Sequence, residues 1–274
     1  MKTFRLVLAL ALGAVLQAPA GEIITVKGSD TMVILAQRWA ERYMAAHPDV
    51  TIQVTGGGSG TGISGLFNGT TDLCHASRPM KPSERDKLKA RFGSRGVEIK
   101  AAQDGLSVYV HESNPVAELS LGQIKDIYAG KITNWKALGG PDARIILYGR
   151  ENNSGTYVYF RDNVLLGEDY SATMQSLPGT AAVVNAVAKD KNSIGYGGAA
   201  YGKGIREIRV KKDAEGPGYA PTAENIKSGV YPVTRFLYLY TRNRPSGALK
   251  EYIDWILSDE GQKIAVEVGY FPIR

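Results

Sequence analysis

The sequence predicts a protein of the α/β class. Short apolar runs alternate along its 274 residues with amphipathic segments in which apolar residues recur at helical spacing. Such alternation of strands and helices is typical of α/β proteins. The chain has no internal repeat and no low-complexity tract, and it is long enough to bury a large core in one domain or two.

The first expected elements are a strand at residues 22–28 and a helix over residues 31–46. Apolar residues of the helix, including Trp39 and Tyr43, fall on one face, and Pro48 lies just beyond its end. The elements expected after them, up to residue 130, are strands at 51–56 and 71–79, a short helix near 63–67, a helix over 83–92, strands within 97–111 and a helix from 120 to 130.

Two capping boxes mark the starts of expected helices. Ser83 with Asp86, and Ser120 with Gln123, have the spacing at which two side chains bond to each other's backbone N–H groups. The segment 213–221 is expected to be a surface loop. The elements expected in the second half of the chain are strands at 144–149, 193–198 and 236–241, and helices over 156–165, 180–189, 247–257 and 260–268.

The first twenty residues have the features of a secretory signal peptide. Lys2 and Arg5 precede an apolar run at residues 6–16, and the small-residue motif Ala-Pro-Ala follows. The apolar run is shorter than the roughly 20 residues that a membrane-spanning helix needs, and no cysteine stands at the expected cleavage site. We therefore expect residues 1–20 to be removed and the mature protein to be exported to the periplasm without a lipid anchor.

Charge and composition disfavour several classes of protein. The net charge of the chain is +6, and it falls to +4 without residues 1–20, which contain two basic residues and no acidic one. This mild positive charge suits the attraction of small anions, but it is too weak and dispersed for nucleic acid binding. The three histidines are scattered and Cys74 is the only cysteine, so we expect neither a metal centre nor an internal disulfide.

Three segments share one design, in which a strand ends, small polar residues follow and a helix begins. They are KGSDT at 27–31, GGGSGTG at 56–62 and NNSGT at 152–156. The first turn of a helix has backbone N–H groups without partners, and these groups, with the positive end of the helix dipole, attract an anion. Glycine lets the backbone approach closely, and Ser and Thr hydroxyls add donors. Such junctions also cap ordinary helices, but three of them together favour an anion site.

Two arginines and two aspartates stand near these junctions or at strand ends. Arg78 and Arg150 each offer a planar guanidinium that can bind two oxygens of an oxyanion, although an exposed or salt-bridged arginine is the alternative for each. Asp30 and Asp104 can accept the proton of a hydrogen phosphate, which sulfate lacks at neutral pH. Capping a helix is an equally good role for Asp30, and ending a strand is an alternative role for Asp104.

Other motif interpretations are weaker. The segment GTGISG at residues 60–65 matches the G-x-G-x-x-G pattern of dinucleotide-binding proteins, but an exported protein meets little nicotinamide cofactor. The chain has neither the G-x-x-x-x-G-K-[ST] motif of nucleotide triphosphatases nor the G-x-S-x-G motif of hydrolases. We therefore expect no cofactor, and catalysis is disfavoured.

The three junctions, in this order, resemble those of the phosphate-binding proteins of bacterial phosphate ABC importers. The likeness covers nearly the whole chain after residue 20, and GKITNW together with R-x-x-x-S-G-T is its most specific part. The further segments that carry it are VTGGGSGTGISGLFNGTTDL, ASRPM, SIGYGG, SGVYPVTRFLYLYT and SDEGQKIAVEVGYFPI. The resemblance implies a receptor that binds inorganic phosphate and delivers it to a membrane permease, without catalysing a reaction.

The same resemblance implies a type II periplasmic binding protein fold. Its two lobes are each a mixed sheet flanked by helices, and the ligand binds in the cleft between them. Lobe 1 would comprise residues 21–103 and 234–274, and lobe 2 would comprise residues 104–233. The chain would cross between the lobes near residues 101–106 and 230–236. Nothing in the sequence demands more than a monomer.

The family's motifs also indicate which residues would contact the ligand. The phosphate-binding residues that the resemblance implies are Ser29, Asp30, Thr31, Ser59, Gly60, Arg78, Arg150, Ser154, Gly155 and Thr156. Many relatives have an aspartate at the position of Arg78, where it accepts the phosphate proton, so Asp30 or Asp104 would have to take that role here. A receptor for another tetrahedral oxyanion such as sulfate, or an exported phosphoryl-transfer or hydrolytic enzyme, is the alternative.

Overall fold

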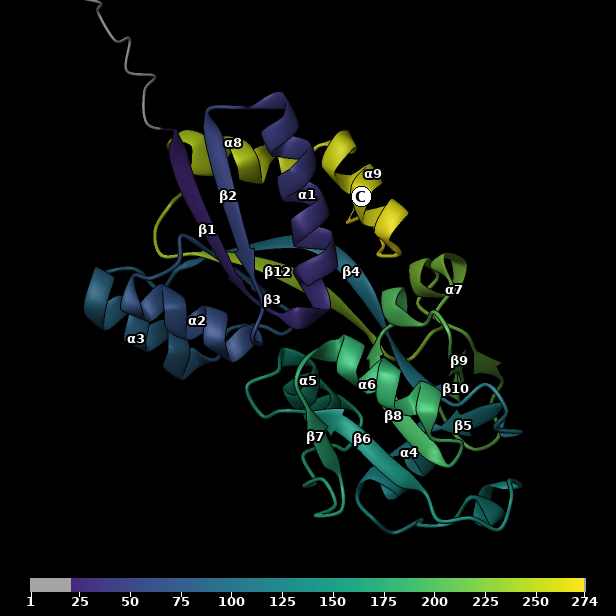
Figure 1. Ribbon diagram of the computed structural model, residues 1–274. Coiled ribbons are helices and arrows are strands. Elements are labelled where there is room, and N and C mark those ends of the chain that lie inside the picture. Colours follow the sequence, from purple (N-terminus) through teal and green to yellow (C-terminus); the bar gives the residue numbers. More distant parts are fainter. Residues whose placement is uncertain (1–20, 274) are drawn as a thin grey trace, which may run out of the picture.

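The computed structural model describes residues 21–273. The expected signal peptide, residues 1–20, lies outside the described residues. Figure 1 shows an upper and a lower α/β half, which are connected by the long strand β4 (Val97–Val110) and by the chain that leads into β12 (Thr234–Thr241).

One sheet runs through both halves, in the order β2-β1-β3-β12-β4-β8-β6-β7. In the upper half, β1 (Glu22–Gly28) lies between β2 (Val50–Thr55) and β3 (Leu73–Ala76) and is parallel to both. β12 is antiparallel to β3 and to β4. The sheet of the upper half is therefore mixed.

Strand β4 belongs to both halves. Its residues between Val97 and Gly105 pair with β12, and those between Leu106 and Val110 pair with β8 (Ser193–Gly198). Beyond β8 lie two more strands, β6 (Ile146–Arg150) and β7 (Gln175–Leu177). The short strands of the lower half are β5 (Glu118–Ser120), β9 (Arg206–Glu207), β10 (Arg209–Lys211) and β11 (Gly218–Tyr219).

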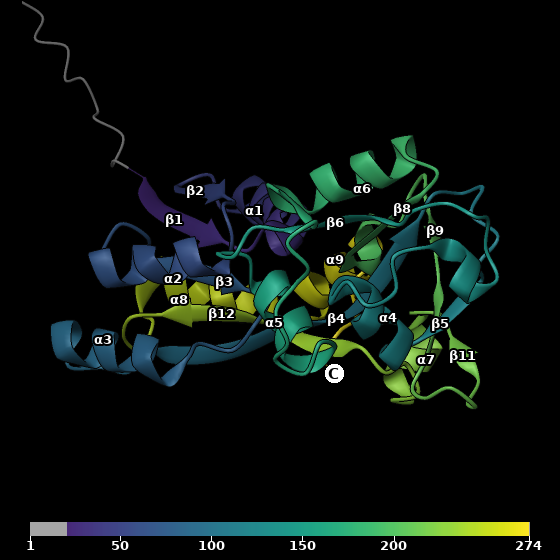
Figure 2. The same ribbon diagram turned by 90° about the horizontal axis from the view of Figure 1, so that it is seen from below.

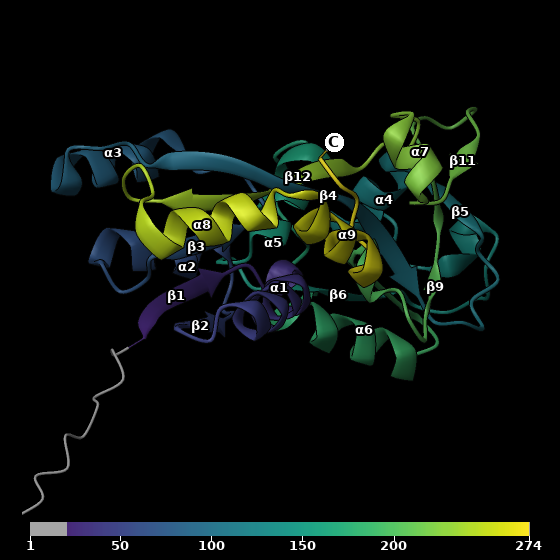
Figure 3. The ribbon, with the colours of Figure 1, turned by 90° about the horizontal axis from the view of Figure 1, so that it is seen from above.

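Different helices cover the two faces of the upper sheet, because successive strand residues point to opposite faces. Leu237 and Leu239 of β12 pack on α1, α8 and α9, which lie close together in Figure 3, whereas Tyr238 and Tyr240 pack on α2 and α3. The bounds of these helices are α1 (Val33–Ala46), α2 (Ser59–Asn68), α3 (Pro82–Phe92), α8 (Gly247–Ile256) and α9 (Asp259–Val268). Trp39 Nε1 donates to the Gly261 carbonyl oxygen at 2.7 Å and ties α1 to α9.

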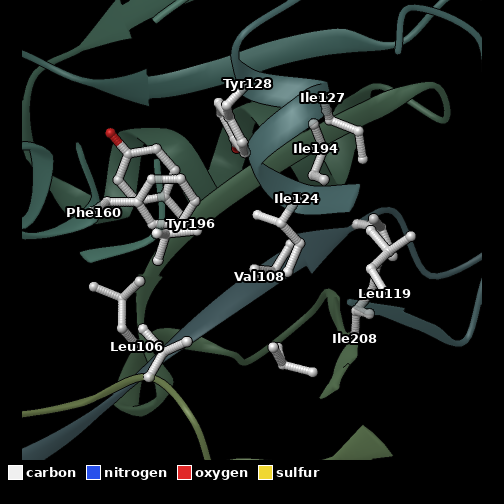
Figure 4. Close-up of a cluster of buried hydrophobic side chains, with 14 of the residues drawn as sticks. Leu106, Val108, Leu119, Ile124, Ile127, Tyr128, Phe160, Ile194, Tyr196 and Ile208 are labelled. Atoms are coloured by element: carbon white, nitrogen blue, oxygen red, sulfur yellow. The ribbon is translucent and has the colours of Figure 1, made fainter. Parts of the chain in front are cut away.

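An aromatic group forms part of the core of the lower half (Figure 4). The rings of Phe160 and Tyr196 are stacked with their centroids 4.0 Å apart, and Tyr128 meets both of them edge-on. The helices around this core are α4 (Leu121–Tyr128), α5 (Gly155–Asn163) and α7 (Ala223–Lys227). Helix α6 (Gly179–Lys189) packs on Tyr109 in a separate, smaller cluster.

The upper and lower cores are separate. Buried residues of the lower cluster all lie between Leu106 and Val233, and those of the main upper cluster lie before residue 103 or after residue 236. Each half therefore has its own apolar interior, as an independent folding unit requires. We propose that residues 21–103 with 234–274 form lobe 1 and that residues 104–233 form lobe 2, and these names are used below.

Two helix starts show how local sequence sets the element bounds. Ser120 Oγ accepts from Gln123 N at 3.1 Å and Gln123 Oε1 accepts from Ser120 N at 2.9 Å, which confirms this capping box. The short helix expected near residues 63–67 begins earlier, at Ser59, inside the glycine-rich motif. Glycine weakens a helix in isolation, but here the close packing of α2 on β1 and β3 favours the helical start.

The capping box expected at Ser83 and Asp86 is wrong. Helix α3 begins at Pro82, and the N–H of Lys81 donates to Glu84 Oε2 at 2.7 Å. Proline is favoured at the first helical position because its φ is already helical and its missing N–H would have no partner there. The N-cap is therefore Lys81, two residues before Ser83, and the capping carboxylate is that of Glu84.

The GKITNW segment ends in a tryptophan that is fully buried in the lower core, with Nε1 donating to the Asn192 carbonyl oxygen at 2.8 Å. Trp135→Ala removes this packing and leaves the carbonyl without its partner, so we expect the free energy of unfolding to fall by about 3–5 kcal/mol. Urea unfolding followed by circular dichroism measures the change. In the exposed neighbour, Lys136→Ala should change stability by less than about 0.5 kcal/mol. A Trp135→Ala variant as stable as the parent would contradict this packing.

Candidate functional site

The three predicted junctions meet at the boundary between the lobes. The first is the end of β1 and a short 3-10 helix, Asp30–Met32, which leads into α1; the others are the starts of α2 and α5. α2 belongs to lobe 1 and α5 to lobe 2, and their ends lie side by side in Figures 1 and 2. Helix starts from both lobes therefore point at one place.

Hydroxyl groups from both lobes are in mutual contact at this place. Ser29 Oγ donates to Ser77 Oγ at 2.9 Å, and Ser59 Oγ lies 3.3 Å from Ser77 Oγ and accepts from its N–H at 3.0 Å. Thr31 Oγ1 and Thr156 Oγ1, from opposite lobes, are 2.8 Å apart. All five residues are buried. We call Ser29, Thr31, Ser59, Ser77 and Thr156 the hydroxyl cluster.

Gly155 is the point at which α5 comes closest to lobe 1. A Cβ at this position would lie 2.3 Å from Ser59 Oγ and 2.6 Å from Ser77 Oγ. Such distances are far inside van der Waals contact, so only glycine allows the first turn of α5 to face the hydroxyl cluster. The N-terminal end of α5 is thereby brought up to the hydroxyls.

Ser154 has a capping role. Its Oγ accepts from the N–H groups of Thr156 and Tyr157 at 3.2 and 3.3 Å, and the residue is buried. This is the usual position for a serine at a helix start. The side chain orients the first turn of α5, while the hydroxyl that lies among those of lobe 1 belongs to Thr156.

Arg150 and Asp30 form an ion pair across the boundary. Arg150 Nη2 donates to Asp30 Oδ2 at 2.6 Å, and Nη1 donates to Thr180 Oγ1 at 2.8 Å. Asp30 Oδ1 accepts from Gly57 N at 2.8 Å. Burial lowers the pKa of Arg150, and Asp30 offsets part of this change. The guanidinium keeps its charge at ordinary pH, because arginine is not deprotonated in proteins. Its Nε is buried and has no hydrogen-bond partner among the described residues.

A second buried ion pair, between Arg235 and Asp104, was missed in the sequence analysis because Arg235 was not considered. Arg235 Nε and Nη2 donate to Asp104 Oδ2 at 3.0 and 2.7 Å, and Nη1 donates to the Ser77 carbonyl oxygen at 3.2 Å. The two residues face each other in the pairing of β12 with β4. The sequence does contain an indication of this pair. Arg235 stands at the start of the apolar run FLYLYT, where a buried charge is costly unless it is paired.

Arg78 does not join the cluster, contrary to expectation. Both of its terminal nitrogens donate to Glu84, at 2.8 and 2.7 Å, and Nη1 also donates to the Pro79 carbonyl oxygen at 2.9 Å. The carboxylate that caps α3 thus takes the guanidinium, because a two-point ion pair compensates the burial of both groups. Ser77, one residue before Arg78, is the member of this loop that reaches the site.

The Gly60 amide is also engaged elsewhere, because its N–H donates to the Asn153 carbonyl oxygen at 2.9 Å. Below the cluster, the His75 carbonyl oxygen accepts from Ser29 N at 2.8 Å. Burial lowers the pKa of the His75 imidazole to about 4, so this side chain is neutral at ordinary pH and adds no positive charge to the site.

The arrangement is suited to holding a small anion. Between residues 21 and 273, no group of three or more His, Cys, Asp or Glu side chains could hold a metal ion. The same residues include no helix long and apolar enough to cross a membrane. A surface cavity of about 600 Å³ lies beside α5, lined by residues that include Tyr157 and Tyr170, but the hydroxyl cluster is not part of it.

Comparison with known proteins agrees with this description. Residues 14–260 match the PBP superfamily domain, so the chain has the fold of the PBP superfamily. Phosphate-binding protein PstS of Pseudomonas aeruginosa is 33% identical over 263 residues, which cover 90% of this chain and 81% of the relative. The chain belongs to the PstS family of phosphate-binding proteins.

Two solved structures are similar over almost the whole chain. One is from Clostridium perfringens, a phosphate ABC transporter substrate-binding protein with bound phosphate, with a TM-score of 0.85, 32% identity, and coverage of 92% of this chain and 100% of that one. The other is an ABC-type phosphate transport receptor from Vibrio cholerae, with a TM-score of 0.72, 30% identity and the same coverage. The predicted α/β periplasmic binding protein fold is confirmed.

Replacing Arg235 should lower the free energy of unfolding, because the charge of Asp104 would be buried without a partner. Burial raises the pKa of Asp104 above its usual range, and Arg235 offsets only part of this rise. Arg235→Leu leaves the carboxylate buried without a partner, so we expect the free energy of unfolding to fall by about 3–5 kcal/mol at pH 7. Without Arg235, the pKa of Asp104 in the folded chain would rise further above its value in the unfolded chain. A group whose pKa is raised by folding stabilises the folded chain at low pH, and this stabilisation is lost as the pH rises. The destabilisation should therefore shrink as the pH is lowered from 7 towards about 4.

Urea unfolding at several pH values measures this dependence. The control is Arg161→Leu, which removes a partly exposed arginine whose ionic partner is its neighbour Asp162, and its effect should be small at every pH. If the loss of stability in Arg235→Leu were the same at pH 4 as at pH 7, the loss would not come from the unpaired charge of Asp104.

Proposed function

We propose that this protein is the phosphate-binding receptor of a phosphate ABC importer and binds inorganic phosphate between its lobes. The observation that carries the proposal is the hydroxyl cluster, in which buried hydroxyls of both lobes converge beside two buried arginines. Membership of the PstS family, whose members are named for phosphate binding, supports the same ligand. The protein acts as a receptor rather than an enzyme.

The ligand's chemistry explains the composition of the site. A small dianion is strongly hydrated, so a protein that binds it must replace each lost water contact with a fixed donor. Serine and threonine hydroxyls, the Gly155 amide at the start of α5 and the guanidinium of Arg150 are such donors. We infer that Ser29, Thr31, Ser59, Ser77, Arg150, Gly155 and Thr156 contact the anion. Ser154 orients α5, and Arg235 holds the Asp104 carboxylate.

Closure of the lobes belongs to this function. Donors of lobe 1 and lobe 2 can surround one ion only when the lobes are together, so binding favours the closed state. All members of the hydroxyl cluster are buried in the present structure, which therefore corresponds to the closed arrangement. Opening would release the ion to a permease.

A carboxylate in the site would distinguish phosphate from sulfate, because only phosphate can donate a proton. Both carboxylate oxygens of Asp30 already accept hydrogen bonds, from Gly57 and Arg150. Within the described residues, the hydrogen bonds of Asp104 all go to Oδ2. We therefore assign the role of proton acceptor to Asp104 rather than to Asp30.

The cellular setting follows from the same proposal. Residues 1–20 are a signal peptide, and the mature chain works in the periplasm, without a lipid anchor, as the partner of a membrane permease. A monomer is sufficient for this role, because the donors of the site come from one chain. The family's link to ABC transport supports the permease as partner.

Removal of the Arg150 guanidinium, which reaches across the boundary between the lobes, should weaken phosphate binding. Arg150→Ala deletes a charged donor of the site, so we expect phosphate binding to weaken by at least about 2 kcal/mol, or about thirtyfold in Kd. Isothermal titration calorimetry with inorganic phosphate measures it. Arg161→Ala, at the exposed end of α5, is the matched control and should bind as the parent does. An Arg150→Ala variant with the parent's affinity would remove this residue from the site.

Competition with sulfate tests the identity of the anion. We expect a hundredfold excess of sulfate to leave phosphate bound between pH 5 and 8, because sulfate brings no proton to the Asp104 carboxylate and would meet it as a buried like charge. In Asp104→Asn that repulsion is gone, so sulfate should compete measurably. Equal competition by the two anions in the parent protein would favour the alternative, a receptor for another tetrahedral oxyanion.

A further inference from the structure

A residue of lobe 2 that lies outside the hydroxyl cluster holds the segment GGGSGTG of lobe 1. We call this segment, residues 56–62, the glycine-rich loop, and it includes the first turn of α2. Asn153 Nδ2 donates to the Gly57 carbonyl oxygen at 3.0 Å and to Thr61 Oγ1 at 3.3 Å. The Asn153 carbonyl oxygen accepts from Gly60 N at 2.9 Å. All three hydrogen bonds cross the boundary between the lobes, and all of them join protein to protein.

The glycines of this loop fit around Asn153. A Cβ on Gly58 would lie 2.8 Å from the Asn153 carbonyl oxygen, and a Cβ on Gly60 would lie 3.1 Å from it. Gly58 also has a φ of +91°, which side chains rarely tolerate. The loop therefore lacks side chains where the other lobe approaches most closely. This accounts for glycines that the sequence analysis attributed to close approach of an anion.

Both sides of this contact are held in place. On lobe 1, the Gly57 N–H is bound by Asp30 Oδ1 at 2.8 Å while its carbonyl oxygen is bound by Asn153. On lobe 2, Asn153 directly precedes Ser154, which caps α5. The contact thus joins two positioned backbones, so little ordering is required when it forms.

We propose that Asn153 is a latch between the lobes, a positioning residue that sets the affinity for the anion by stabilising the closed state. The inference rests on the proposed function and extends it. A contact made only in the closed state raises the population of that state, and the apparent affinity for a ligand follows the population that can hold it. Asn153 therefore strengthens binding through closure rather than through the anion.

The rates of association and release distinguish a latch from a residue that contacts the anion as it enters. Hydrogen bonds that form only after closure do not help the anion to enter, but they must break before it leaves. Loss of the latch should therefore raise the rate of phosphate release and leave the rate of association nearly unchanged.

The test compares Asn153→Ala with Asn152→Ala in the mature chain. The two residues are adjacent and of the same type, but Asn152 is exposed. Calorimetry with inorganic phosphate gives Kd, and rapid filtration of radiolabelled phosphate gives the release rate. We expect Asn153→Ala to weaken binding about tenfold, with the whole change in the release rate, and Asn152→Ala to match the parent within about twofold.

A variant on the opposite lobe tests the same contact. Thr61→Val keeps the shape of the side chain but removes the oxygen that accepts from Asn153, so it should weaken binding about threefold. Because the two substitutions remove a shared hydrogen bond, their effects should be less than additive in the double variant. Thermal unfolding shows whether each variant is folded, and Thr61→Val decides the question if Asn153→Ala is not.

The outcomes separate the latch from the proposed function. A parent protein that binds no phosphate would overturn both. A parent that binds, with Asn153→Ala within twofold of it, would overturn the latch alone. Slower association with unchanged release, or strictly additive effects of Asn153→Ala and Thr61→Val, would also reject the latch.

Discussion

The structure depends on keeping buried hydrogen-bond donors satisfied at a boundary between two lobes. Hydroxyls, amides and guanidinium groups that leave water must find partners, because each unsatisfied group costs about 1–3 kcal/mol. In the hydroxyl cluster, Ser77 bonds to both Ser29 and Ser59, and Thr31 bonds to Thr156. A tetrahedral oxyanion has enough acceptor atoms for all of these donors at once. The groups that here donate hydrogen bonds within the protein can therefore donate them to an anion instead.

The strands and helices place charged groups at this boundary as ion pairs. The pairing of β12 with β4 sets Arg235 opposite Asp104, close to where the chain passes between the lobes. The end of β6 carries Arg150 to Asp30 of the other lobe. Each guanidinium is thereby compensated inside the protein. The site therefore holds positive charge in fixed positions while its net charge stays near neutral, and an anion is recognised mainly by the geometry of the donors.

Some of the site was predictable because the chemistry is local. A strand end, a small polar residue and a helix start follow one another along the chain, so the three junctions with Ser29, Ser59 and Thr156 could be recognised one by one. Arg78 was misjudged because its partner is chosen by distance in space: Glu84, which also caps α3, takes both terminal nitrogens. Arg235 was overlooked because its significance lies in the strand pairing.

The sequence by itself determined the α/β class, the order of most elements and the helix starts that carry donors, because apolar periodicity and capping preferences act over a few residues. The tertiary structure decided which donors meet. It placed Ser77 rather than Arg78 beside Ser59, joined Arg235 to Asp104, and set Asn153 against the glycine-rich loop. The first contact joins residues 18 positions apart within lobe 1, whereas the other two join residues 131 and 96 positions apart across the two lobes. Contacts set by tertiary packing leave no local pattern from which they could be predicted.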